Sequence, residues 1–279
     1  MLQISELFIY PIKSLAGISV KDALVTETGF QHDRRWMLVD EYNLFITQRT
    51  VPQMALMKVA IEEDGLTVSY RAEELFIPFN ASTNNRQLLT IWDDTCTGEY
   101  VSQEADAWFS AMLDMNCRLV HMPDDTRRIV DQRYAPENSI TSFADAYPFL
   151  LIGQASLDEL NSRLTEALPM NRFRPNIVFS GGQPFEEDLI GEFTISGISF
   201  QGVKLCARCP IPTINQNTAA RGKEPLKTLA SYRQKNNKIY FGQNLIHKGN
   251  GIISIGDQLR VKSFNHEERF MINEPAGKY

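Results

Sequence analysis

The segment VKLCARCPIPTIN places Cys206 and Cys209 two residues apart, with Arg208 between them and a proline directly after them. A structural zinc site needs four ligands, but the other two cysteines do not form a second close pair and the four histidines are scattered. A thioredoxin-like redox pair needs a helix that begins at the motif, because the helix N-terminus lowers the thiol pKa. Pro210 and Pro212 instead predict an extended continuation.

Two interpretations of this pair remain open. The two thiols could be small hydrophobic residues of the core. Alternatively, one of them is a thiolate ligand of a soft or high-valent metal, and Arg208 contacts an anionic cofactor.

Arginines recur beside glycine, proline or aromatic residues rather than on lysine-rich helix faces. Taken singly, each is more typical of a surface residue or an ion pair than of a ligand contact. If they converge, their planar forks would form an anion-binding pocket, because guanidinium groups bind phosphate or carboxylate in a bidentate manner. The arginines concerned are Arg34, Arg35, Arg49, Arg127, Arg128, Arg133, Arg172, Arg174 and Arg208.

Composition limits the function classes. The 279 residues carry a net charge of −6, which argues against a nucleic-acid polymer as partner, since such proteins usually have a basic excess. With 43% hydrophobic and 22% charged residues, the chain has the balance of a soluble globular protein of one large or two moderate domains. No apolar run is long enough to span a membrane and the N-terminus lacks a secretion signal, so we expect a cytoplasmic protein.

The elements that must position these residues are mostly strands. Apolar residues alternate over 3–12, 34–40 with 43–48, 54–64 with 65–71, and 191–205, between glycine, asparagine and aspartate turns. Helical spacing appears only around residues 104–113, 156–164 and 225–233. The sequence therefore predicts a β-rich α+β fold with few helices.

Three local signals define the boundaries of elements. Ser156 with Glu159 three positions later matches a capping box, and Pro225 is well tolerated in a first helical turn. A strand-like CRLVH ends in MPDDT, residues 122–126, which we take as the domain boundary.

Several ordered motifs together resemble the MOSC-domain molybdenum-cofactor proteins, in particular the YcbX-like proteins and the mitochondrial amidoxime-reducing components. YPIKSLAGI and GFQHDRRWMLVD resemble the N-terminal β-barrel module. FADAYPFLLIGQASLDELN, NRFRPNIVFSG, PFEED, CARC, EPLKTLASYR and FGQNL resemble the MOSC module. The resemblance implies a MOSC N-terminal β-barrel domain over 1–122, packed on a MOSC-domain β-barrel over 123–265, and a C-terminal tail over 266–279.

The resemblance also implies roles for individual residues. Cys209 matches the family's molybdenum-ligating thiolate, whereas Cys206 matches no assigned role and is better explained by packing or by contacts behind the metal ligand. Asp145 matches an acidic residue near the metal that could orient substrate or move protons, although aspartates also fix turns. The positions that match cofactor-binding residues of the family, which hold the pterin and its phosphate, are Lys13, Ser14, Arg34, Arg174, Asn176 and Arg208.

The chain differs from its relatives in ways that bear on its partners. No cysteine follows Cys209, so a ferredoxin-type iron–sulfur cluster cannot be bound downstream and electrons must come from another protein, such as a ferredoxin-like or flavoprotein reductase. The barrel motif begins within the first residues, so we expect no membrane anchor. No pyridoxal-phosphate region precedes the motifs, unlike in the molybdenum-cofactor sulfurases.

Two functions from different classes follow from the resemblance. The first is a molybdenum-dependent oxidoreductase with a molybdopterin cofactor (Moco) that reduces N-hydroxylated small molecules, such as hydroxylaminopurines and amidoximes, to amines. The second is a cofactor carrier or sulfur-transfer module that holds a persulfide on Cys206 or Cys209. The set of anion-binding residues favours the first.

Overall fold

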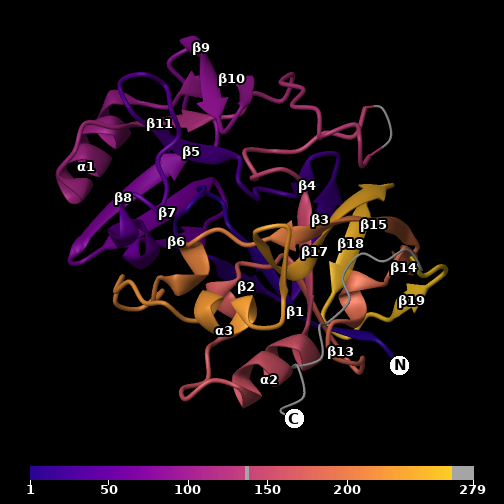
Figure 1. Cartoon of the computed structure of the whole chain (residues 1–279). Helices are drawn as coiled ribbons and strands as arrows, with labels where there is room; N and C mark the ends of the chain where they lie inside the picture. Colours follow the sequence, from indigo (N-terminus) through magenta and orange to yellow (C-terminus); the bar gives the residue numbers. More distant parts are fainter. Residues whose placement is uncertain (136–137, 266–279) are drawn as a thin grey trace.

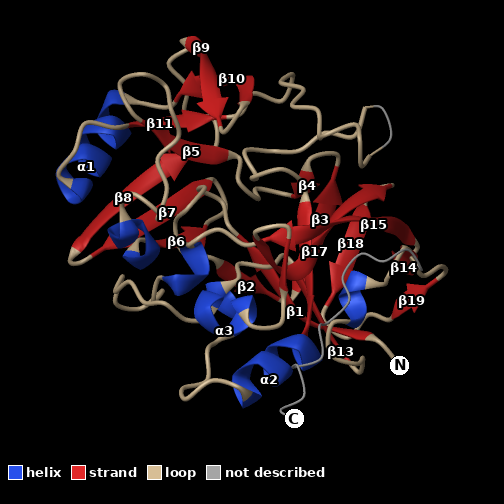
Figure 2. Cartoon of the chain, viewed as in Figure 1, coloured by secondary structure: helices blue, strands red, loops and turns tan. Residues whose placement is uncertain are grey.

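A computed structural model describes residues 1–135 and 138–265, and the predicted tail over 266–279 lies outside the described residues. Its largest sheet has nine strands and an antiparallel majority (Figures 1 and 2). In spatial order these are β19 (Leu259–Val261), β14 (Glu192–Ile195), β15 (Ile198–Ala207), β17 (Lys238–Lys248), β12 (Phe149–Gly153), β13 (Ile177–Ser180), β1 (Gln3–Ile9) and β2 (Ile18–Val20), with β16 (Gln234–Lys235) paired to β17.

Three smaller sheets complete the β-structure. One contains β5 (Trp36–Val39), β11 (Arg118–His121), β10 (Asp94–Tyr100) and β9 (Arg86–Ile91). A second contains β6 (Lys58–Ile61), β7 (Gly65–Tyr70) and β8 (Glu73–Pro78), and the third contains β18 (Gly251–Ser254), β3 (Asp22–Thr26) and β4 (Gly29–Phe30). The prediction of a β-rich α+β fold is confirmed.

Two early strands, β1 and β3, belong to the core of the C-terminal half. β1 pairs with β13 from Gln3 opposite Ser180 to Leu7 opposite Ile177, and β3 pairs with β18. Ile4 and Leu7 are buried in one hydrophobic cluster with aromatic residues of β12, β13, β14 and β15. In Figure 1 the indigo β1 accordingly lies beside β13, away from the violet strands that follow it in the sequence. The proposed boundary near residue 122 stays a prediction, but the two segments it separates share a sheet.

The remainder of the N-terminal segment has its own core. A second cluster contains fully buried residues from the first two of the smaller sheets and from the first helix, namely Leu38, Leu66, Val68, Phe109 and Leu119. Figure 2 shows this part as strands with one helix at its outer edge. It forms one wall of the site described below.

The described residues contain three α-helices, at the three predicted places. They are α1 (Gln103–Leu113), α2 (Gln154–Ser162) and α3 (Leu226–Ala230). Short 3₁₀ turns occur as η1 (Pro52–Leu56), η2 (Met170–Arg172), η3 (Glu186–Asp188) and η4 (Ile211–Thr213). None of the described helices is both long and apolar enough to cross a bilayer.

Three local predictions were wrong. The capping box fails because the N-cap of α2 is Gly153, three residues before Ser156. Ser156 therefore lies inside the helix, where its hydroxyl donates to Glu187 at 2.7 Å. Residues 43–48 form only isolated bridges, and residues 54–56 lie in η1 instead of a strand. The chain after the cysteine pair is the 3₁₀ turn η4 rather than extended, because the backbone N–H and hydroxyl of Thr213 both bond back to the carbonyl of Pro210.

Candidate cofactor-binding site

A cavity of about 120 Å³ lies between the N-terminal module and the large sheet. It is lined by every residue to which the family resemblance assigned a site role, although these come from five separate motifs. They are Lys13, Ser14, Arg34, Asp145, Arg174, Asn176, Arg208 and Cys209. The structure therefore brings all eight together, and their roles toward a cofactor stay predictions.

Strained backbone positions occur at the loops that carry these side chains. Ser14, Arg34 and Arg174 have φ values of 69°, 51° and 55°, in the left-handed region that non-glycine residues seldom occupy. Each lies in a loop next to a strand: Ser14 after β1, Arg34 before β5, and Arg174 before β13. Because such conformations persist only where the surroundings enforce them and cluster at functional sites, their convergence supports a binding role for this cavity.

Arg34 and Arg174 both lie over the buried ring of Tyr10, with guanidinium carbons 4.5 and 4.2 Å from its centroid. Arg34 also donates to the Asp33 carboxylate at 2.5 Å and to the Asn176 amide oxygen at 3.1 Å. Burial, which outweighs the attraction of the neighbouring acids, lowers the pKa of Arg174 to about 10. Tyr10 thus lies beneath two guanidinium groups, of which only Arg34 has a carboxylate partner, Asp33, so an anion near Arg174 would be favourable.

The cysteine pair lies at the end of β15, where the ladder with β17 shifts register twice, between Gly202 and Lys204 and again between Leu205 and Ala207. Such bulges bend a strand and re-aim its side chains, and they are common next to active sites. Here they turn the chain so that both sulfurs line the cavity.

The two cysteines differ in environment. Cys206 packs against the aromatic cluster that contains Phe173, and its sulfur accepts a hydrogen bond from Arg208 Nη1 at 3.1 Å. Burial raises the pKa of the Cys206 thiol and outweighs the positive charge of Arg208, which lowers it. The sulfur of Cys209, by contrast, has no hydrogen bond to any described residue. The preferred packing interpretation of Cys206 agrees with these contacts.

No group of three or more histidine, cysteine or acidic side chains that could hold a metal exists among residues 1–135 and 138–265. A metal at Cys209 would therefore need further ligands from a cofactor. A cofactor that brings its own sulfur ligands fits a site that offers one thiolate.

Arg174 and Arg208 have no carboxylate within 4 Å in the described part of the chain. Arg208 Nη2 donates to the Phe173 carbonyl at 2.7 Å, but its buried Nε has no partner among the described residues. Arg174 also lines a neighbouring groove of about 750 Å³, which extends the room beyond the small cavity. Unpaired, partly desolvated guanidinium groups with a spare donor fit the phosphate of a pterin cofactor.

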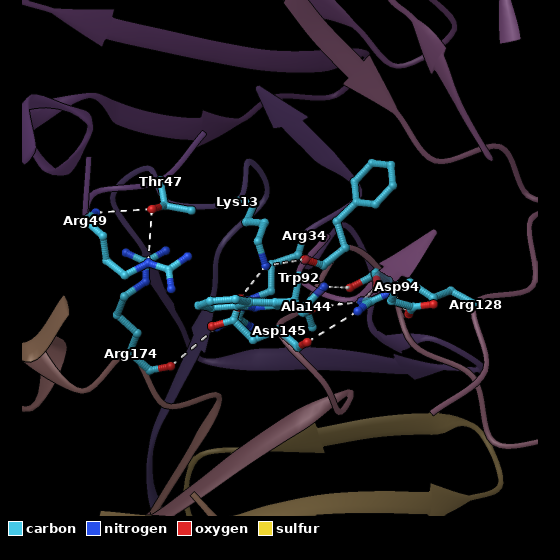
Figure 3. A network of polar contacts seen from close by, with 12 residues as sticks. Lys13, Arg34, Thr47, Arg49, Trp92, Asp94, Arg128, Ala144, Asp145 and Arg174 are labelled. Atoms are coloured by element: carbon cyan, nitrogen blue, oxygen red, sulfur yellow. Dashed lines mark hydrogen bonds and ion pairs between the residues drawn. The ribbon is translucent and has the colours of Figure 1, made fainter. Parts of the chain in front are cut away.

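Lys13 and Asp145 form an ion pair at the opposite wall of the cavity (Figure 3). The Lys13 ammonium donates to Asp145 at 2.6 Å and to the Phe143 carbonyl at 2.7 Å. Burial lowers the pKa of Lys13 to about 8 despite the carboxylate. Partial removal from water opposes ionisation of Asp145, but Lys13 and Arg34 outweigh it and hold the pKa of that carboxyl well below its usual range. Lys13 is thus engaged by the protein's own groups.

Sequence reasoning missed Trp92 and Thr47 around this pair, and it named Arg128 only among the candidate anion-binding arginines. Arg128 is buried and donates to the carbonyls of Ser142 and Ala144 at 2.9 and 2.5 Å, so it fixes the loop that carries Asp145. Trp92 Nε1 donates to Asp145 at 3.4 Å, and Thr47 lines the cavity (Figure 3). Arg128 belongs to the arginines that the sequence pattern pointed to, whereas no local sequence pattern pointed to Trp92.

Comparison with known proteins identifies two family modules in this chain. The family model described as the MOSC N-terminal beta barrel domain matches residues 1–116, and that of the MOSC domain matches residues 138–260. Mitochondrial amidoxime-reducing component 1 of mouse is 33% identical over 91% of this chain and 80% of its own length, and the human protein of that name is 32% identical over 91% and 81%. Molybdenum cofactor sulfurase of tomato is 31% identical over 88% of this chain, which spans 33% of that protein.

Proposed function

The chain belongs to the MOSC-domain family, with a MOSC N-terminal β-barrel ahead of its MOSC domain, and from that premise we propose a molybdenum-dependent reductase of N-hydroxylated small molecules. The single observation that carries this proposal is the cavity in which the free cysteine Cys209, two arginines without a carboxylate partner among the described residues and an ionised carboxylate meet. Relatives named for amidoxime reduction, at about a third identity, agree with it.

The proposed reaction cleaves an N–O bond. The substrate takes up two electrons and two protons, and an amine and water leave. A bound molybdenum cofactor supplies the redox centre for these electrons, which come from a separate protein of ferredoxin or flavoprotein type.

The chain's own residues would hold the cofactor at both ends. Cys209 provides a soft anionic ligand for the metal, and Arg174, Arg208, Arg34 and Asn176 provide donors for the anionic and amide groups of the pterin. The Ser14 hydroxyl lies in the same wall.

Lys13 and Asp145 would handle substrate and protons. The Asp145 carboxylate is 56% exposed, ionised and held by Lys13, so it can accept a hydrogen bond from an N–H group of the substrate. Lys13, with a pKa of about 8, is still mainly protonated at neutral pH and can supply a proton to a substrate held at Asp145.

The proposal is tested with the purified full chain expressed in a cofactor-producing host. We expect stoichiometric molybdenum, release of a pterin on denaturation, and conversion of benzamidoxime to benzamidine with reduced methyl viologen. Cys209→Ser is the control, since it removes the metal ligand but no arginine. Molybdenum and pterin without any amine product would overturn the reductase proposal, and a persulfide on Cys206 or Cys209 without molybdenum would favour sulfur transfer.

A further inference from the structure

An exposed indole lies beside Asp145 at this cavity. Trp92 occupies the two-residue turn between β9 and β10, and its side chain is 44% exposed. Its φ of 59° belongs to the left-handed region, which glycine and asparagine adopt far more readily than a bulky aromatic residue. An exposed tryptophan at such a position works against local backbone preference, and an outlier of this kind is a reason to look for a function.

Two side chains support the indole from behind. The Arg49 guanidinium carbon is 3.7 Å from the centroid of the Trp92 ring, and the Phe45 ring centroid is 5.3 Å away. Arg49 is itself held by Thr47, whose hydroxyl accepts hydrogen bonds from its backbone N–H and its Nε, each at 3.2 Å (Figure 3). Since Thr47 lines the cavity, the indole is anchored to the site and its exposed surface remains open to a ligand.

Asp145 adds a polar anchor next to this surface. Its Oδ1 receives both Lys13 and the Trp92 Nε1–H, at 2.6 and 3.4 Å. Its Oδ2 has no partner among residues 1–135 and 138–265, and the side chain is more than half exposed. A carboxylate oxygen free to accept N–H groups, beside an aromatic face, suits a flat conjugated group that carries N–H donors or a delocalised positive charge.

We infer that Trp92, backed by Arg49 and Phe45, forms with Asp145 a subsite that selects planar, conjugated amidine-type substrates, such as aromatic amidoximes and N-hydroxylated nucleobases, over small aliphatic ones. The expected effect on kcat/KM rests on the proposed reductase function, whereas ligand binding to the subsite can be measured without turnover. Trp92 acts as a specificity residue and Asp145 as the hydrogen-bond acceptor.

The first measurement is the ratio of kcat/KM for benzamidoxime to that for acetamidoxime. We expect this ratio to fall about tenfold in Trp92→Ala and Trp92→Asn, because a lost aromatic contact of ordinary strength corresponds to about that factor. Trp92→Phe should keep most of the preference. Asparagine tolerates the turn geometry, so Trp92→Asn separates loss of selectivity from loss of folding, and its melting temperature should equal or exceed the wild-type value. Phe76→Ala removes a comparably exposed aromatic group that lines none of these cavities, and serves as control.

The second measurement is equilibrium binding of benzamidine to the holoprotein by calorimetry. Weaker binding in Trp92→Ala and Trp92→Asn, with unchanged molybdenum content, supports the subsite. If neither amidoxime is reduced yet benzamidine binding still depends on Trp92, the reductase proposal fails and the subsite stands. If both amidoximes are reduced, and neither the ratio nor the benzamidine affinity changes in any Trp92 variant, the subsite is wrong.

Discussion

Replacement of Arg174 by lysine is the sharpest test of the anion pocket. Arg174 is 8% exposed, lies over Tyr10, and donates one hydrogen bond, from Nη1 to the Leu15 carbonyl at 2.7 Å. No carboxylate pairs with it among the described residues, so its charge is available to a ligand. Lysine keeps a positive charge but loses the planar fork.

The expected loss has two parts. One hydrogen bond to a charged group contributes about 1.5–3 kcal/mol, so loss of one fork contact should weaken cofactor affinity roughly 10- to 150-fold. In addition, burial already lowers the pKa of Lys13 in this cavity to about 8, even with Asp145 beside it. A lysine at 174 would lack such a carboxylate and should have a lower pKa than Lys13. Because only the ammonium form attracts the anion, retention in the variant should fall as the pH rises from about 6 to about 9.

The assay is molybdenum and pterin per chain, measured after desalting at a series of pH values. The wild-type protein should keep its cofactor throughout, whereas Arg174→Lys should lose it progressively toward alkaline pH. Arg86→Lys is the matched control, since Arg86 is half exposed on β9 and pairs with Glu99 and Asp125, where solvent screens the ion pairs and their contribution is small. Full and pH-independent occupancy in a folded Arg174→Lys variant would refute the anion-pocket argument.

Three further outcomes are expected. Cys209→Ser should abolish activity and the thiolate-to-metal absorption, while Cys206→Ser should be much milder because that sulfur packs and contacts Arg208; equal losses would point to a dithiol mechanism. The isolated chain should reduce amidoximes with an artificial donor but not with NADH, since its sequence has no GxGxxG fingerprint; robust NADH turnover would reveal an overlooked redox site. Burial raises the pKa of Glu187 to about 8, so the unfolded chain binds fewer protons than the folded one above about pH 4.5 and stability falls as the pH rises to about 8. Glu187→Gln should remove this pH-dependent loss of folding stability, which amounts to up to a few kcal/mol. The variant should have a higher melting temperature than the wild type at pH 8.5 but not at pH 5, and an equal difference at both pH values would contradict this.

The sequence predicted the strand-rich fold and the three helices because alternation and helical spacing are local signals. It also identified the residues of the cavity, but their convergence came from the family resemblance and not from any spacing. The failed capping box at Ser156 illustrates the limit. The pattern fits a helix start, yet the Ser156 hydroxyl bonds to Glu187, which is thirty-one positions away, and this tertiary contact overrides the local preference.

Other features depend on contacts that no local pattern encodes. The hydrogen bond from Arg208 to the Cys206 sulfur distinguishes two cysteines that look equivalent in CARC. Trp92 reaches Asp145 from a hairpin fifty-three positions away, and the turn that presents it contains neither glycine nor asparagine. Such residues can be found only once the two segments are placed against each other.

The pairing of β1 with β13 also governs the order in which the molecule can assemble. β1 can pair with β2 early, but it can pair with β13 only when Ser180 has emerged, which at common elongation rates takes roughly 10 to 35 s after the synthesis of β1. Until then Ile4 and Leu7 lack the later strands whose aromatic residues bury them, while the two smaller sheets built from strands β5 to β11 can already form. Part of the middle of the chain can thus fold before β1 joins β13 in the large sheet.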